Sequence, residues 1–230
     1  MRGAELDEVR FRSTGDPAVV PRWRGWIHLW SFVVAVAAGV PLIVLAGVTV
    51  SGAAAAAVAV YTATLLGLFG TSALYHRHAW RTERSRTLMD RLDHSMIFVF
   101  IAGTYTPITV LALAPPTDTV LLVVTWVGAV GGIVLTVAWP AAPRWVGVPL
   151  YLALGWVAVF VLPDLLHYGG VAALTMLCVG GALYSLGAVA YAIRRPNPFP
   201  ATFGYHEVFH ACVVLAAICH YAGLWFALSS

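Results

Sequence analysis

The sequence predicts an all-α integral membrane protein with seven transmembrane helices, an N-terminus in the cytoplasm and a C-terminus outside. Hydrophobic residues make up 60% of the 230 residues and charged residues only 10%, whereas soluble domains carry roughly 25% charged residues. Apolar runs recur at about the 20-residue length that a helix needs to cross a bilayer. Arginines occur only in every second gap between these runs, and this alternation sets the orientation.

Hydropathy places the spans between charged segments and turn-forming residues. They are expected at about 27–50, 53–75, 93–113, 119–139, 146–163, 169–192 and 206–228. Turn signals separate three pairs of spans at Ser51-Gly52, at Pro115 to Asp118 and at Pro163-Asp164. The fifth span is the shortest. Alanine and glycine recur throughout, as is typical of membrane helices that pack closely.

The chain divides into a polar N-terminal cytoplasmic tail, residues 1–26, and a transmembrane domain, residues 27–230. The tail mixes arginines with acidic residues and lacks the apolar core of a signal peptide. We therefore expect a tail that is not cleaved.

Orientation follows from the basic residues, all 13 of which are arginines. They fall in the tail and in the expected loops 76–92, 140–145 and 193–205, while the opposite loops hold Asp118 and Asp164 but no arginine. Because cytoplasmic loops are enriched in Arg and Lys, seven crossings put the tail inside and the C-terminus outside. The arginines flank apolar runs instead of forming one patch, so no nucleic-acid partner is expected.

Polar residues gather at three ends of the expected spans. They are Ser72 and His76 at the end of the second span, Asp93 at the start of the third, and His206 and His210 at the start of the seventh. Ionisable side chains inside a membrane are costly and are usually functional. Residues i and i+4 share a helix face, and the expected topology places all five residues near one cytoplasmic level. We therefore predict that the three histidines converge.

Imidazole is a good zinc ligand, and we predict that His76, His206 and His210 bind one Zn²⁺. Three protein ligands leave a fourth position for water, as in catalytic zinc sites, and zinc activates such a water at neutral pH. Asp93 is the predicted base for this water. Ser72 is predicted to hold the water or a developing oxyanion.

Structural interpretations of the same residues stay open. The histidines can instead make interhelical hydrogen bonds, and Asp93 can pair with Arg91 or another loop arginine. The hydroxyl of Ser72 can bond to the carbonyl one turn earlier in its own helix.

Four further polar residues are expected to have structural roles. His94 and Glu207 each follow a predicted site residue directly and therefore point about 100° away from it. His28 is expected at the membrane interface. His220 lies too far along its helix to bind the same ion and is expected to pack in the outer leaflet.

The motifs resemble those of the hemolysin III family, the bacterial branch of the progestin and adiponectin receptor superfamily. The resemblance covers the chain from about residue 22 and rests on Ser72 to His76 (Ser-Ala-Leu-Tyr-His), Leu92-Asp93-His94, Ala102 to Pro107 (Ala-Gly-Thr-Tyr-Thr-Pro) and His206 to His210. It implies a seven-helix protein of the bacterial inner (plasma) membrane. It also implies zinc bound by the three histidines, with the serine and aspartate beside the metal-bound water.

The family is also similar to alkaline ceramidases, so the resemblance implies a metal-dependent hydrolase of lipid amide or ester bonds involved in membrane lipid homeostasis. Its expected partners are membrane lipids, with a lipid or fatty acid as substrate. A lipid-sensing or signalling protein with structural zinc is the alternative. A pore-forming hemolysin is disfavoured, because a released cytolysin needs an export signal and a water-compatible surface.

Overall fold

The computed structural model describes residues 20–139 and 142–229, so most of the predicted polar tail lies outside the described residues. In the described ranges the regular secondary structure is helical, with no β-strand and one isolated β-bridge between Phe199 and Phe203. The elements are α2 (Trp26–Thr49), α3 (Gly52–Arg77), α4 (Glu83–Ala112), α5 (Thr117–Ala138), α6 (Arg144–Gly155), the 3-10 helix η1 (Trp156–Val161), α7 (Leu162–Ile193) and α8 (Tyr205–Ser229).

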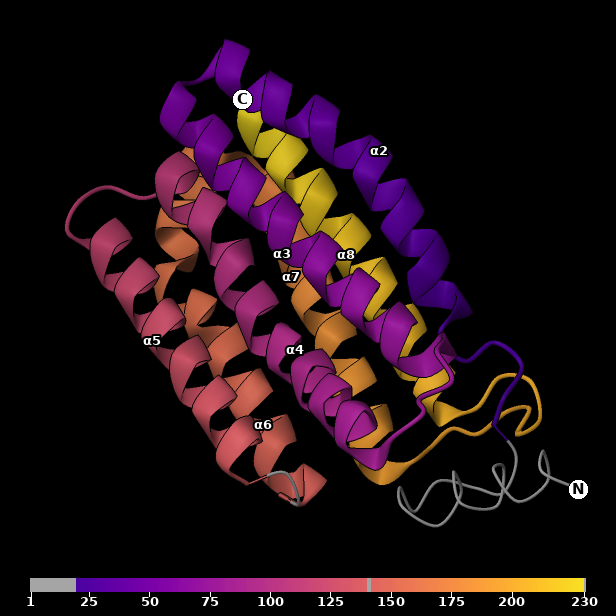
Figure 1. Cartoon of the computed structure of the whole chain (residues 1–230). Helices are drawn as coiled ribbons and strands as arrows, with labels where there is room; N and C mark the ends of the chain where they lie inside the picture. Colours follow the sequence, from indigo (N-terminus) through magenta and orange to yellow (C-terminus); the bar gives the residue numbers. More distant parts are fainter. Residues whose placement is uncertain (1–19, 140–141, 230) are drawn as a thin grey trace, which may run out of the picture.

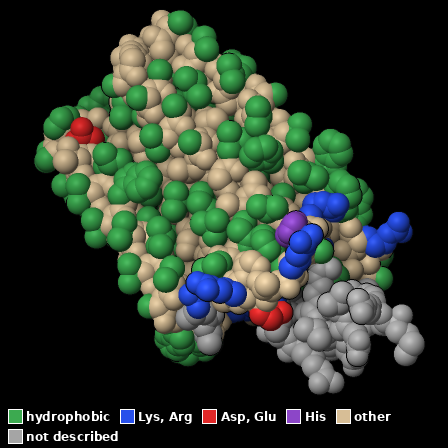
Figure 2. Space-filling view, viewed as in Figure 1, with side chains coloured by type: hydrophobic (Ala, Val, Ile, Leu, Met, Phe, Trp, Pro, Cys, Tyr) green, Lys and Arg blue, Asp and Glu red, His purple; other side chains and the backbone are tan. Residues whose placement is uncertain are grey.

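Six helical segments of the described chain are long and apolar enough to cross a membrane, with Arg144–Ile193 taken as one stretch of 50 residues. Large apolar side chains lie on the outside, among them Val48 and Phe160, which are 77% and 85% exposed. Figure 2 shows hydrophobic side chains spread over the visible face, with arginines gathered at one end. A bilayer, unlike water, is a favourable solvent for such a surface. The prediction of an all-α membrane protein is confirmed.

The helices form one bundle with α4 at its centre, because α4 contacts α3, α5, α6, α7 and α8. The end of α3 and the starts of α2, α4, α6 and α8 lie at the same end of the bundle (Figure 1). The predicted polar residues at the ends of the second, third and seventh spans therefore lie at one end of the protein. Contacts of Arg77 with Trp26 and of Arg144 with Tyr191 join helix ends there.

The expected loop 76–92 is wrong, because α4 begins at Glu83, ten residues before the predicted span. The side chain of Thr82 caps this helix by accepting a hydrogen bond from the Ser85 amide at 3.2 Å. Glu83 in the first turn adds a favourable interaction with the helix dipole. The helix thus extends beyond the apolar segment, because capping and not hydropathy decides where it starts.

The predicted turn at Pro163-Asp164 is also wrong. Both residues lie in the first turn of α7, where proline is tolerated because its missing amide would have no helical partner. The break in helical geometry comes later, at Gly170, where φ is 75° and ψ is 170°. Glycine adopts this conformation without the steric penalty that a Cβ imposes.

A second irregularity is the 3-10 helix η1, which interrupts the helical stretch Arg144–Ile193 between α6 and α7. Here the side chain of Tyr105 in α4 reaches the backbone of the neighbouring segment: its hydroxyl donates to the Gly155 carbonyl at 2.6 Å and accepts from the Ala158 amide at 2.9 Å. Backbone groups at membrane depth need partners within the protein, because lipid tails offer none. Tyr105 supplies those partners where the α-helix ends.

Candidate metal centre

Three imidazoles from the two ends of the chain meet at one end of the bundle. His76 lies in the last turn of α3, and His206 and His210 lie one turn apart at the start of α8. Their ligand nitrogens all lie within 4.8 Å of one another, and the Nε2 atoms of His76 and His206 are 3.1 Å apart. A tetrahedral ion with nitrogen ligands at about 2.0–2.1 Å separates them by roughly 3.3 Å. These residues can therefore hold a metal ion, and the predicted convergence is confirmed.

The surroundings of the three histidines favour a bound cation. His210 is 3% exposed, the His76 side chain is 8% exposed, and Nδ1 of His206 is buried without a hydrogen-bond partner among the described residues. Unpaired polar atoms are costly in an apolar interior. Neutral imidazole suits zinc, copper, iron and nickel alike. The geometry thus indicates a metal site.

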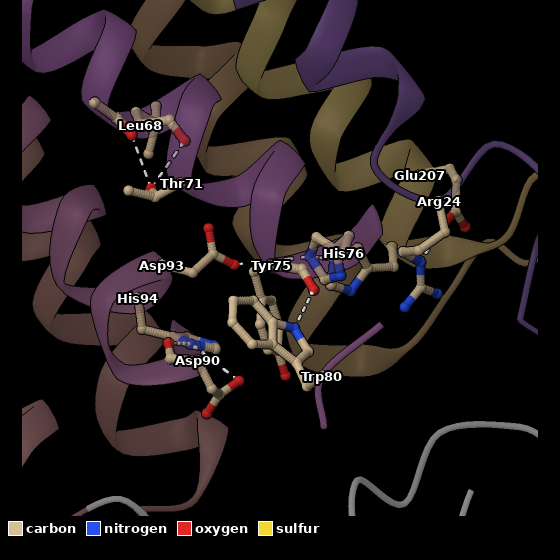
Figure 3. Close-up of polar contacts among 12 residues, drawn as sticks. Arg24, Leu68, Thr71, Tyr75, His76, Trp80, Asp90, Asp93, His94 and Glu207 are labelled. Carbon is tan, nitrogen blue, oxygen red and sulfur yellow. Dashed lines mark hydrogen bonds and ion pairs between the residues drawn. The ribbon is translucent and has the colours of Figure 1, made fainter. Parts of the chain in front are cut away.

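Asp93 and Ser72 lie beside the histidines. The Oδ2 atom of Asp93 is 3.7 Å from Nε2 of His76, and Figure 3 shows this carboxylate pointing from α4 toward α3. The Ser72 side chain is buried, and Ser72 lines the same cavity as Asp93. In the described part of the chain no ion pair joins Asp93 to Arg91. The predicted neighbourhood is therefore present, while the catalytic roles of the two residues stay predictions.

The interfacial position expected for His28 is wrong. His28 is 2% exposed, and its ring stacks on that of His210 with centroids 3.9 Å apart. Neither of its nitrogens has a hydrogen-bond partner within the described residues. The neighbouring Trp26 and Trp30 indicate a headgroup position, because tryptophan is enriched at membrane interfaces, but α2 starts at the same end of the bundle as α8 (Figure 1). The predicted topology already places the starts of the first and seventh spans at the same depth in the membrane, and this signal could have identified His28 as part of the site.

The His94 side chain contacts the backbone of its own helix. Its Nδ1 atom lies 2.8 Å from the carbonyl oxygen of Asp90, one turn earlier in α4. The side chain is thereby held against its own helix, as Figure 3 shows.

A cavity of about 530 Å³ adjoins the histidine cluster. Its volume falls in the usual range of small-molecule sites. Ser72, Asp93 and the three histidines line it together with apolar side chains deeper in the bundle, including Leu68, Ile101, Ile108 and Val213. The arrangement joins a polar, metal-competent group to an apolar chamber, which suits an amphiphilic ligand.

Comparison with known proteins gives one matching family and several relatives. The family model described as "Haemolysin-III related" matches residues 19–221. The chain is 30% identical over 155 residues to "Hemolysin-3 homolog" of Bacillus subtilis, covering 67% of this chain and 69% of that protein. It is 31% identical over 166 residues to "Hemolysin-3" of Bacillus cereus, covering 71% and 72%. It is 27% identical over 169 residues to the human "Monocyte to macrophage differentiation factor", covering 72% and 68%.

Proposed function

The chain belongs to the hemolysin III family, within the progestin and adiponectin receptor superfamily, and we propose that it is a zinc-dependent hydrolase of lipid amide or ester bonds. Family membership and six membrane-competent helices make it a multi-pass protein of the cell membrane. The observation that carries the proposal is the position of Asp93, 3.7 Å from His76, where a metal-competent cluster meets an apolar cavity.

The proposed topology has seven crossings, with the N-terminus in the cytoplasm. A continuous helix of 50 residues, the length of Arg144–Ile193, would measure about 75 Å, whereas the hydrocarbon core is about 30 Å thick. This stretch therefore crosses twice, with the break at Gly170 between the crossings. The histidine cluster then lies in the cytoplasmic half of the membrane, beside the arginine-rich helix ends.

Each residue of the site has a task in the proposed reaction. His76, His206 and His210 hold the ion, which when bound supplies Lewis acidity toward a carbonyl and toward water. Asp93 accepts the proton of the attacking water and passes it to the leaving amine or alcohol as the C–N or C–O bond breaks. The hydroxyl of Ser72, which lines the cavity beside the histidines, holds the water or the developing oxyanion. The apolar cavity holds the acyl chain and excludes bulk water.

The experiment is turnover by purified, zinc-loaded protein against ceramides, acyl amides and phospholipids, with released fatty acid measured by mass spectrometry. Wild type should release fatty acid from at least one substrate class. Asp93→Asn should lower kcat at least about 100-fold with zinc content unchanged. Asp118→Asn, in the first turn of α5, is the control. A fully loaded wild-type protein that cleaves no member of the panel contradicts the proposal.

A second candidate is a lipid-sensing protein in which the ion has a structural role. It is favoured by one observation: the histidines join α3 to α8, two helices whose backbones are not closely packed. An ion held between them stabilises their arrangement. The Asp93→Asn variant separates the two candidates. If the variant protein retains its zinc and restores the function of wild type in cells that lack the native protein, the ion has a structural role.

A further inference from the structure

The lining of the cavity extends well beyond the histidine cluster and includes a second polar group. Both His210 and His220 line it, and ten residues of α8 separate them by about 15 Å along the helix axis. The apolar residues Ile108, Leu165 and Val213 line the cavity as well. A ligand that fills this space therefore follows α8 into the interior of the membrane.

Tyr184 of α7 and His220 of α8 form the polar group at this inner end, which we call the inner polar pair. Their rings meet edge to face with centroids 5.3 Å apart. Nε2 of His220 is 3.3 Å from the Leu177 carbonyl oxygen. The Tyr184 hydroxyl and Nδ1 of His220 are buried and have no hydrogen-bond partner in the described part of the chain.

The fold makes room for this pair. A Cβ atom added to Gly180 would overlap the His220 ring, so the imidazole lies directly against the α7 backbone. The simple packing role expected for His220 does not explain two unpaired polar atoms on residues that line a cavity. Such atoms are costly inside a membrane unless a polar group bonds to them, and ionisable residues there usually mark a functional site.

We propose that the inner polar pair is a second binding subsite, which takes a hydroxyl or carbonyl group carried along the hydrocarbon chain of a lipid-like ligand. This inference rests on the proposed function in one respect, since the histidine cluster holds the ligand's other polar end. The apolar walls contact the hydrocarbon between the two polar groups. The preferred ligand is therefore an oxygenated acyl chain and not a plain one.

Equilibrium binding of two probes tests the subsite: a long-chain fatty acid and the same acid with a hydroxyl group in mid-chain. Metal-loaded wild-type protein in detergent should bind the hydroxylated acid about fivefold more tightly, the contribution of one net hydrogen bond. Tyr184→Phe and His220→Gln should each reduce this preference, and metal content should stay unchanged. Equal binding of both acids by wild type, or full preference in Tyr184→Phe, overturns the inference.

Two further measurements exclude an indirect effect. Tyr221→Phe is the matched control, because Tyr221 does not line the cavity and its hydroxyl donates to the Ala38 carbonyl of α2. This variant should prefer the hydroxylated acid as strongly as wild type does. Tyr184→Phe should not lower the thermal stability of the ligand-free protein, since no hydrogen bond is lost. A drop in stability would indicate a structural hydroxyl and would count against the subsite.

The outcome is separable from that of the proposed function. If metal-loaded wild-type protein binds both acids equally, only the proposed subsite is contradicted. If the protein binds the hydroxylated acid more tightly but cleaves no substrate, only the proposed hydrolase activity is contradicted.

Discussion

The guanidinium Nε of Arg24 lies 2.5 Å from Oε1 of Glu207, joining residues 183 positions apart. Glu207 is 1% exposed, and its Oε2 atom accepts the Gly204 amide at 2.9 Å. Figure 3 shows the pair on the far side of His76 from Asp93. The segment before α2 is thereby fixed to the first turn of α8, the turn that also carries His206.

Removing the charge of Glu207 should therefore affect both stability and metal binding. We expect Glu207→Gln to cost about 3 kcal/mol, because the ion pair that the buried Glu207 carboxylate makes with Arg24 is lost. Metal affinity should fall roughly 10-fold, as for other groups that orient metal ligands. Thermal unfolding in detergent and metal titration measure the two effects.

Glu83→Gln is the matched control for this change. Glu83 pairs with Arg86 at 3.2 Å, but its side chain is 62% exposed. An exposed pair contributes at most about 1 kcal/mol, so metal binding should not change. Equal effects of the two substitutions would show that burial of the Arg24 pair is unimportant.

Replacement of any one of His76, His206 and His210 by alanine should abolish stoichiometric metal binding. Two remaining imidazoles cannot complete the site, and the loss should exceed the roughly 10–100-fold typical of residues outside the coordination sphere. Elemental analysis of purified protein gives the metal content per chain. His78→Ala, at an exposed residue two positions from His76, should retain the metal. Stoichiometric zinc in the triad variants would rule out this ligand set.

Tyr105→Phe should destabilise the protein by about 1–3 kcal/mol, because the Gly155 carbonyl and the Ala158 amide lose their partner inside the membrane. The measurement is thermal unfolding in detergent. Tyr168→Phe, at a side chain 51% exposed, should have no effect. A Tyr105 variant as stable as wild type would mean that water or lipid headgroups reach these backbone groups.

Two adjacent glycines of α5 should respond in opposite ways to alanine. A Cβ on Gly132 would overlap the buried Phe98 ring of α4, whereas a Cβ on Gly131 would meet nothing within 4 Å. We expect Gly132→Ala to cost about 1–3 kcal/mol through overpacking. Gly131→Ala should be neutral or stabilise by up to about 1 kcal/mol through helix propensity. The same change in stability at both positions, measured by thermal unfolding, would contradict the α4–α5 packing.

Reporter fusions test the seven proposed crossings. Alkaline phosphatase, which is active only outside the cytoplasm, should be active when fused after Ser230 and inactive when fused after Arg195. This pattern follows from the arginine-rich helix ends being cytoplasmic. An inactive C-terminal fusion together with an active one at Arg195 would reverse the topology, and equal activity at both would contradict a final crossing by α8.

The sequence by itself determined the all-helical membrane class, the approximate spans and the approach of His76 to His206 and His210. Hydropathy, arginine distribution and i, i+4 spacing can all be read from short segments of sequence. Hydropathy and arginine distribution also indicate how deep a residue lies in the membrane. Depth alone was enough to place three histidines, Asp93 and Ser72 at one level, because a bundle of spanning helices leaves few other arrangements.

The tertiary structure alone decided the remaining features. Whether His28 faces headgroups or His210 depends on how α2 is rotated against α8, and the flanking tryptophans do not report this rotation. The break at Gly170, the bonds from Tyr105 to η1 and the inner polar pair each depend on contacts between helices far apart in sequence. Hydropathy records how deep a residue lies, but only packing decides which neighbours it meets.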